Sequence, residues 1–352
     1  MTSCARIPWL CVPVFALVVA FPAIPARAQT QWSQKFSVSE GFTALAFDGK
    51  RILASTDGRD IYESPDGEEW KLFAENRGQP VRMAGGLIFA FEAAIYTSAD
   101  GKAWQFQNIK SSSLELRDVA HNGSLFVAVG RDRIADTALL LTSPDAKAWA
   151  HQSFNGMRNA LYSVCWTGAR FVVVGESISA FGDSTGKVTG NPGPILTSED
   201  GITWSRRTTV SPMDADKVIW TGKRVVAAAD EMMASPDGID WKLQTWHQGY
   251  DIDMVANNGD QVVGFSYDTL YISDGGQGWI RRPNPMRAFI ADALFTGKSW
   301  IAATTGGKIY VSPVDTGVAI RPRSQRRAPL KTPPVGRFPY HGRLRDALGA
   351  AH

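Results

Sequence analysis

The chain has 352 residues, of which 44% are hydrophobic and 20% charged, a composition typical of globular proteins. The formal net charge of +3 is unevenly distributed: residues 1–28 carry +2 and residues 321–352 carry +7, which leaves −6 on residues 29–320. An acidic body argues against nucleic-acid binding by the main part of the chain. Glycine and proline follow no collagen-like or low-complexity register.

A short apolar segment opens the chain. Arg6 precedes an apolar stretch from Trp9 to Phe21, and Ala26-Arg27-Ala28 has the A-x-A pattern of a signal-peptidase site. Pro13 interrupts this stretch and Pro22 follows it directly, and the stretch is short for a membrane span, so a cleaved signal peptide over 1–28 is favoured over a membrane anchor. We therefore expect a secreted or periplasmic protein without a transmembrane segment.

Two of the three cysteines, Cys4 and Cys11, lie within the signal peptide. Cys165 is then alone in the mature chain and has no partner for an internal disulfide. It lies in an apolar run, which favours a buried structural thiol over a nucleophile. The fold must therefore be stabilised by its hydrophobic core.

One motif, Ser-x-Asp-Gly-x-x-Trp, recurs six times along the body, and a degraded seventh copy begins at Ser312. The third copy has Ala146 in place of glycine, and the sixth has Gly275 where aspartate is expected. The motif aspartates are Asp66, Asp100, Asp145, Asp200 and Asp237. The motif tryptophans are Trp70, Trp104, Trp149, Trp204, Trp241 and Trp279.

A second landmark, Gly-x-x-apolar, opens a short apolar run before each copy, at Gly49, Gly85, Gly123, Gly168, Gly222, Gly259 and Gly297. Short apolar runs bounded by glycine predict buried strands, and the Asn-Gly and Asp-Gly pairs between runs predict hairpin turns. Each unit of ~40 residues therefore predicts four antiparallel strands, a to d in chain order. Seven such units are typical of a β-propeller, whereas a helical solenoid is excluded because no 3.6-residue period is sustained.

The last unit lacks its tryptophan strand. Trp32 and the residues after it match the segments that follow the motif tryptophans, so we expect residues 31–37 to supply strand d of the final blade. Trp32 then completes a set of one tryptophan per blade. The predicted fold is an all-β, seven-bladed β-propeller of four-stranded antiparallel blades over residues 29–320, closed by the N-terminal strand.

Over residues 31–318 the chain resembles the Asp-box, or BNR-repeat, propellers, which include sialidase-like proteins and the photosystem II assembly factor family. The motif here is a shortened variant, because the usual Asp-box has one more residue between aspartate and glycine. The resemblance implies a structural turn remote from the ligand face. The local pattern agrees: the aspartate caps a turn and the tryptophan packs between blades. A ring of carboxylates that binds metal is the alternative, and we expect no metal.

The b–c connections mark the face that varies between units. The turn glycine and the motif serine lie 13–15 residues apart in five units, but 20 apart in the third and 30 in the fourth. The longer b–c loops predict a binding lip on that face, joined by d–a loops that carry His151 and Arg158, with a solvated flap as the alternative. The candidate binding residues are Arg131, Asp132, Arg133, Phe181, Asp183, Lys187, His247 and Tyr250.

Three functions are compatible with this architecture. The favoured one is a non-enzymatic scaffold, a monomer that binds a protein or glycan on the loop-rich face without a cofactor. A sialidase-like glycoside hydrolase is the alternative, but its chemistry needs an arginine cluster and a Tyr–Glu pair that no motif assigns. A quinoprotein-type dehydrogenase is the third, and Cys165 alone cannot form the vicinal disulfide often found in that group.

The C-terminal segment, residues 321–352, is basic and rich in proline. Such a composition cannot bury a core, so we expect a disordered extension. Attraction of this tail to anionic surfaces is the second interpretation.

Overall fold

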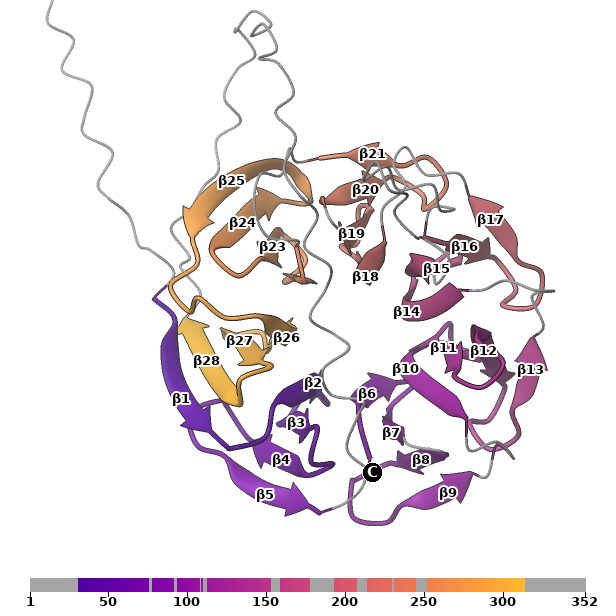
Figure 1. The fold of residues 1–352 in the computed structure, drawn as a ribbon, viewed down its shortest axis with the longest axis horizontal. Helices are drawn as coiled ribbons and strands as arrows, with labels where there is room; N and C mark the ends of the chain where they lie inside the picture. Colours follow the sequence, from indigo (N-terminus) through magenta and orange to yellow (C-terminus); the bar gives the residue numbers. More distant parts are fainter. Residues whose placement is uncertain are drawn as a thin grey trace, which may run out of the picture.

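The computed structural model describes residues 31–75, 78–91, 94–107, 109, 113–152, 159–177, 193–207, 214–229, 231–244 and 252–313. All regular secondary structure in these residues is β-strand, arranged as seven four-stranded antiparallel sheets around a ring (Figure 1). The predicted seven-bladed propeller is therefore confirmed. The predicted signal peptide and basic tail lie outside the described residues, as do Phe181, Asp183, Lys187, His247 and Tyr250.

The first three blades follow the chain from the N-terminal side. Blade 1 consists of β2 (Phe42–Phe47), β3 (Ile52–Thr56), β4 (Ile61–Ser64) and β5 (Lys71–Ala74). Blade 2 consists of β6 (Val81–Ala84), β7 (Leu87–Phe91), β8 (Ile95–Ser98) and β9 (Gln105–Gln107). Blade 3 consists of β10 (Leu114–His121), β11 (Phe126–Asp132), β12 (Thr137–Ser143) and β13 (Ala150–Gln152).

The next three blades have the same strand order. Blade 4 consists of β14 (Asn159–Trp166), β15 (Phe171–Ser177), β16 (Ile195–Ser198) and β17 (Ser205–Arg207). Blade 5 consists of β18 (Ala215–Trp220), β19 (Val225–Ala229), β20 (Met233–Ser235) and β21 (Lys242–Leu243). Blade 6 consists of β22 (Met254–Asn257), β23 (Gln261–Phe265), β24 (Thr269–Asp274) and β25 (Gln277–Pro283).

Blade 7 joins the two ends of the propeller. It consists of β26 (Ile290–Phe295), β27 (Ser299–Thr304), β28 (Lys308–Pro313) and the N-terminal strand β1 (Ser33–Ser37). Strand β1 pairs antiparallel with β28, from Ser33 opposite Val311 to Ser37 opposite Lys308. This pairing confirms the predicted closure, in which the first segment of the propeller covers the edge of its last sheet.

The first strand of each blade lies nearest the ring axis, and the last strand lies at the rim (Figure 1). The seven predicted turn glycines all lie between the first and second strands, with φ between +54° and +102°. A side chain rarely adopts this conformation, which explains the recurrence of glycine. The a–b turns and the motif turns consequently lie on one face of the ring, and the b–c and d–a connections lie on the other.

Each intact motif turn, here called a box turn, closes on its own side chains. In blade 2, Gly101 N donates to Ser98 Oγ at 2.8 Å and Lys102 N donates to Asp100 Oδ1 at 2.8 Å. Trp104 Nε1 donates to the Gly101 carbonyl at 2.7 Å. The same three kinds of bond recur in blades 1, 4 and 5. The serine and aspartate side chains thus form their hydrogen bonds within the turn itself.

The seven tryptophans lie in seven separate apolar clusters, each formed between two adjacent blades. Trp241 is the most deeply buried, with 4% of its surface exposed, and shares its cluster with Val172 of blade 4. The indole nitrogens of Trp32 and Trp279 find no acceptor among the described residues. Neither tryptophan belongs to an intact box turn: blade 6 has Gly275 at the aspartate position, and the strand that follows Trp32 comes from the N-terminal end of the propeller.

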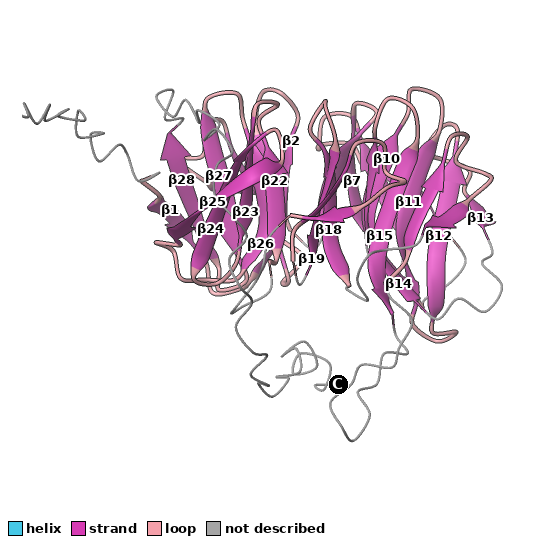
Figure 2. Cartoon of the chain, turned by 90° about the horizontal axis from the view of Figure 1, so that it is seen from above, coloured by secondary structure: helices cyan, strands magenta, loops and turns pink. Residues whose placement is uncertain are grey.

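Blades 3 and 4 are taller than the others. Strands β10 and β14 each have eight residues, and β11 and β12 pair over seven, so only residues 133–136 connect them. The expectation of a longer loop in blade 3 is therefore wrong: the extra residues extend two paired strands, because pairing satisfies their backbone groups. Figure 2 shows β12 and β14 reaching beyond the strands of blade 5 on one face.

Candidate functional site

Bulges in the innermost strands aim a ring of side chains at the centre of the propeller. Five of these strands carry a register shift, at Phe42/Ala44, Leu116/Asp118, Leu161/Ser163, Ala215/Lys217 and Ile290/Asp292. A bulge turns the following side chain relative to a regular strand. The residue after each bulge lies five positions before the turn glycine; in order these are Ala44, Asp118, Ser163, Lys217 and Asp292.

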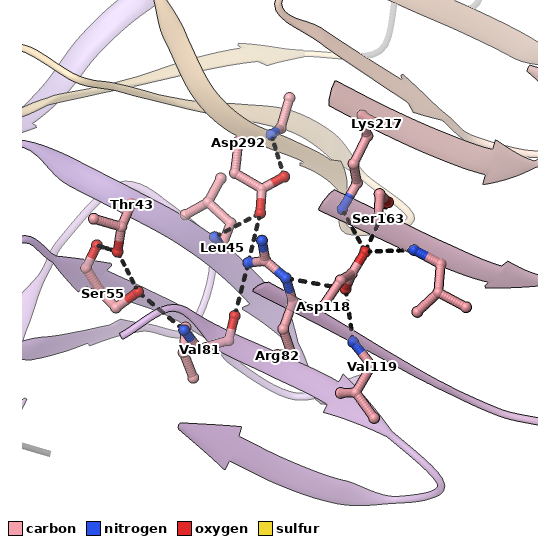
Figure 3. Close-up of polar contacts among 12 residues, drawn as sticks. Thr43, Leu45, Ser55, Val81, Arg82, Asp118, Val119, Ser163, Lys217 and Asp292 are labelled. Carbon is pink, nitrogen blue, oxygen red and sulfur yellow. Dashed lines mark hydrogen bonds and ion pairs between the residues drawn. The ribbon is translucent and has the colours of Figure 1, made fainter. Parts of the chain in front are cut away.

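Four charged side chains meet at this ring (Figure 3). Arg82 Nε donates to Asp118 Oδ1 at 3.1 Å, and Arg82 Nη1 lies 3.2 Å from Asp292 Oδ2. Lys217 Nζ lies 3.5 Å from Asp118 Oδ2, which also accepts a 2.7 Å bond from Ser163 Oγ. We call these five residues the central network. Its two acids and two bases balance in formal charge.

The network is built from one pattern used twice. Asp292, Ala44 and Arg82 lie on blades 7, 1 and 2, and Asp118, Ser163 and Lys217 lie on blades 3, 4 and 5. In each set an acid is followed by a small residue and then by a base. The small residue leaves space for the long base to reach back across its blade to the acid. The Arg82–Asp118 pair then links the two sets.

Both carboxylates also bind the backbone of the next blade. Val164 N donates to Asp118 Oδ2 at 3.2 Å, and Leu45 N donates to Asp292 Oδ2 at 3.1 Å. Each aspartate therefore ties two neighbouring innermost strands together at backbone level. Blade 6 has Met254 at the corresponding position, and this side chain packs in the apolar cluster between blades 6 and 7. The central network and its backbone bonds thus link six blades, whereas blade 6 contributes an apolar side chain at this position.

The environment keeps Asp118 ionised although only 5% of its surface is exposed. Burial alone raises the pKa of Asp118, but Lys217, Arg82 and the bonds from Ser163 and Val164 outweigh it and hold this pKa below its ordinary value. A buried carboxylate paired in this way stays charged near neutral pH. Its chemistry is that of a structural brace, because its oxygens already accept four hydrogen bonds.

The sequence-predicted residues of blade 3 lie at the end of β11 and in the turn that follows it, on the face where blades 3 and 4 are tall. Arg131 Nε lies 3.1 Å from Glu115 Oε2, and Arg117 pairs with the same carboxylate. The Arg117 guanidinium also lies over the Tyr162 ring, 5.5 Å from its centroid. The structure thus joins Arg131, through Glu115, to Arg117 and Tyr162; the sequence singled out none of these three partners.

Asp132 and Arg133 have different environments. Asp132 Oδ1 accepts bonds from Ile134 N at 2.9 Å and Ala135 N at 3.0 Å, so this carboxylate shapes the turn between β11 and β12. The bond from Ala135 N is the largest cause that lowers the pKa of Asp132. Arg133 is exposed, and its backbone N–H donates to the Ser113 carbonyl at 2.9 Å. His151 lies exposed on the rim strand β13.

Sequence reasoning missed the central network. The sequence does contain a pattern that marks most of these residues. Five positions before the turn glycine, aspartate, serine or lysine interrupts the apolar pattern of the innermost strands. Arg82 lies outside that register because the a–b turn of blade 2 is shorter, with Ala84 and Leu87 paired on either side of Gly85-Gly86. The charges differ from blade to blade, so a search for a repeated residue type passes over them.

Two further results concern the described part of the chain. It contains no cluster of three or more histidine, cysteine or acidic side chains arranged to hold a metal ion. Within the same residues, no helix has the length and apolar character needed to cross a membrane.

Comparisons with known proteins identify the fold. No family model matches the chain, and no curated protein matches its sequence. The structure of YCF48 bound to D1 peptide is 14% identical, with a TM-score of 0.59 over 81% of this chain and 97% of that one. Virginiamycin B lyase from Staphylococcus aureus is 7% identical, with a TM-score of 0.63 over 81% of this chain and 98% of that one.

A third similar structure is the extracellular domain of the putative one component system BT4673 from B. thetaiotaomicron. It is 11% identical, with a TM-score of 0.59 over 80% of this chain and 40% of that one. These proteins differ widely in function, and identities this low show a shared fold alone. The chain is therefore a seven-bladed β-propeller, and its function has to be argued from its own residues.

Proposed function

We propose that this protein is a secreted, non-enzymatic scaffold that binds a protein partner on the face where blades 3 and 4 are tall. The observation that carries the proposal is the β11–β12 hairpin, which rises on that face and ends in Ile134, with 84% of its surface exposed. Of the two partner classes compatible with the sequence, a large exposed apolar side chain favours a protein. Secretion rests on the predicted signal peptide over 1–28.

The hairpin tip is held in one conformation. Two backbone bonds to Asp132 fix the turn, and Arg133 N is bonded to the Ser113 carbonyl. A turn constrained by these bonds loses less conformational freedom on binding, so more of the free energy from burying Ile134 contributes to affinity. A few residues dominate the binding energy of a protein interface, and Ile134 is the candidate for such a residue on this face.

The central network supports a scaffold over a sialidase-like enzyme. A hydrolase of that type needs arginines that grip the carboxylate of its substrate. Arg82 at the centre instead donates to Asp118, Asp292 and the Val81 carbonyl. A protein with a similar fold, YCF48, has been solved bound to D1 peptide, so peptide binding is compatible with this fold.

Ile202 provides a matched control for Ile134. It lies at the tip of the box turn of blade 4, on the opposite face, with 61% of its surface exposed. Its backbone N–H donates to Asp200 Oδ1 at 2.8 Å, the same arrangement that Asp132 makes with Ile134. The two isoleucines therefore differ mainly in the face on which they lie.

The experiment compares Ile134→Asp with Ile202→Asp in crosslinking and retention of partner protein from the secreted compartment. We expect Ile134→Asp to reduce retention about tenfold or more, as for loss of an anchor, and Ile202→Asp to leave it unchanged. A third variant replaces residues 178–192 with a Gly-Ser linker, which we expect to leave the fold intact and weaken retention. Equal retention by the two aspartate variants would refute the assignment of partner binding to this face. Robust hydrolysis of a fluorogenic sialoside would refute the scaffold proposal in favour of a sialidase-like enzyme.

A further inference from the structure

A polar cavity lies on blade 4, away from the face proposed for the protein partner. Its volume is about 360 Å³, within the usual range for small-ligand sites. It lies beside the box turn of blade 4, over the paired strands β16 and β17, and its lining includes Arg170, Thr197, Glu199, Asp200, Ser205 and Arg207. All of these side chains are polar.

The cavity faces the neighbouring blade. Ile195 of β16 packs in the cluster that contains Trp241 of blade 5, and Thr197 lies two residues further along the same strand. Side chains two residues apart lie on the same side of a strand. Ser205 and Arg207, paired opposite Thr197 and Ile195, share that side. The cavity therefore lies on the side of blade 4 that is turned toward blade 5.

Its two arginines have unused donors among the described residues. Arg207 Nε donates to Thr197 Oγ1 at 2.7 Å, and no further side-chain bond of Arg207 occurs there, so both terminal nitrogens are available. Arg170 Nη2 lies 3.4 Å from Glu199 Oε1, its one ion pair within 4 Å among the residues that the structure describes, and the charge of Arg170 also helps to lower the pKa of Asp237 in the box turn of blade 5. An arginine offers five N–H donors, so most of the hydrogen-bonding capacity of this pair is unspent.

In blade 1, the arginine that corresponds to Arg170 has a full set of structural partners. Arg51 lies two residues after its turn glycine, as Arg170 does in blade 4. It bonds Asp48 Oδ2 at 3.0 Å and Glu63 Oε2 at 2.8 Å, and it lies over the Phe73 ring at 4.6 Å. In the whole sequence, blade 4 alone combines this arginine with a second one three residues after the motif tryptophan.

The acids of the cavity differ in how firmly they are held. Asp200 Oδ1 accepts bonds from Thr203 N at 2.7 Å, Ile202 N at 2.8 Å and Ser198 Oγ at 2.9 Å, and these bonds hold the pKa of Asp200 well below its ordinary value. The Glu199 side chain is 75% exposed, and Arg170, at 3.4 Å, is its only charged partner in the described part of the chain. Glu199 can therefore leave the arginine at little cost when another carboxylate arrives.

We propose that this cavity binds an acidic sugar. The terminal nitrogens of Arg207 suit a carboxylate through charge-assisted bonds, and Arg170 lines the same cavity as a second cation. The Ser205 hydroxyl, which lies on the same side of the sheet, suits a hydroxyl group of a sugar ring. Glu199 acts as a placeholder that the sugar carboxylate displaces. This site is separate from the face of the proposed function and does not depend on it.

The experiment titrates methyl β-D-glucuronide and uncharged methyl β-D-glucoside against the purified chain, followed by calorimetry or ligand-observed NMR. We expect the glucuronide to bind about tenfold or more tightly than the glucoside, because only the glucuronide engages the arginines. Arg207→Gln should weaken glucuronide binding about tenfold, the effect of losing one charge-assisted pair. Glu199→Gln should strengthen it about threefold or more, because the competing carboxylate is removed.

Glu68→Gln is the charge-matched control. Glu68 is an exposed acid of the box turn in blade 1 and pairs with Lys35, so its removal changes net charge without touching the cavity. We expect it to leave glucuronide affinity unchanged, and all variants should keep the parent thermal midpoint. Equal affinity for the two sugars, or no gain in Glu199→Gln, would overturn the proposal. Acetate or an acidic peptide that bound as well as the glucuronide would overturn the assignment to a sugar.

Discussion

The box turns and the central network use aspartate in the same way but at very different chain separations. In a box turn, Asp100 accepts bonds from the backbone N–H groups two and three residues ahead. In the network, Asp118 accepts a bond from Val164, 46 residues away, and Asp292 accepts one from Leu45, 247 residues away. The first use stabilises a turn and the second joins blades. The same side chain therefore has a local role at the rim and a global role at the centre.

The sharpest test substitutes one aspartate in each region. Asp118→Asn should lower the free energy of unfolding by about 3–5 kcal/mol, because it leaves Lys217 buried without its counter-charge and Arg82 with Asp292 as its remaining acidic partner. Asp100→Asn should cost clearly less, because its turn is exposed to water and keeps its Ser98 and Trp104 bonds. Urea denaturation of both variants measures the difference. Equal losses would show that the central charges contribute no more than a turn.

Tryptophan substitutions compare two seams of the ring. Trp241→Ala should cost about 3–4 kcal/mol, as expected for a large buried aromatic side chain. Trp104→Ala should cost less, because Trp104 is only partly buried at its seam between blades 1 and 2. Thermal denaturation of the two variants tests this order. The opposite order would mean that exposure in the folded state does not predict the contribution of these residues.

Two glycines of blade 5 separate backbone strain from crowding. Gly238 and Gly222 have nearly the same φ, +82° and +84°. A Cβ at Gly238 would lie 2.6 Å from Val172 Cγ2, whereas one at Gly222 would meet nothing within 4 Å. Gly222→Ala should therefore cost about 1 kcal/mol, from strain alone, and Gly238→Ala about 3 kcal/mol, from strain and overpacking. Matching chemical denaturation midpoints for the two variants would contradict this account.

Acidification provides the gentlest perturbation of the network. The pKa of Asp118 is lower in the folded state than its ordinary value, so its contribution to stability is complete above about pH 4 and is lost as pH falls through the folded pKa. The stability gap between the parent and Asp118→Asn should accordingly narrow between pH 7 and pH 3. The pKa values of the box-turn aspartates are also lowered, but these residues are present in both the parent and the variant. Their effect on stability therefore cancels in the difference between the two proteins. A gap that does not change with pH would argue against an ionised Asp118.

Several parts of the fold could be predicted from sequence because their causes are local. A box turn is closed by serine, aspartate, glycine and tryptophan within six residues, so the same letters recur wherever the same turn is needed. The number of blades and the turn glycines follow from those repeats. The closing strand was also predictable, because Trp32 and its neighbours repeat the pattern of the other rim strands.

Tertiary structure decided the features that depend on several blades at once. The extra residues of blade 3 extend a hairpin only because β10 lengthens beside them and satisfies their backbone. The central network needs an acid, a small residue and a base on three successive blades, so each blade contributes a different residue. The cavity of blade 4 needs Arg170 and Arg207, 37 positions apart, on one side of a sheet. Features formed within one blade repeat along the chain and can be predicted from sequence. Features that join several blades need a different residue on each blade, so they become apparent only when the blades are placed in space.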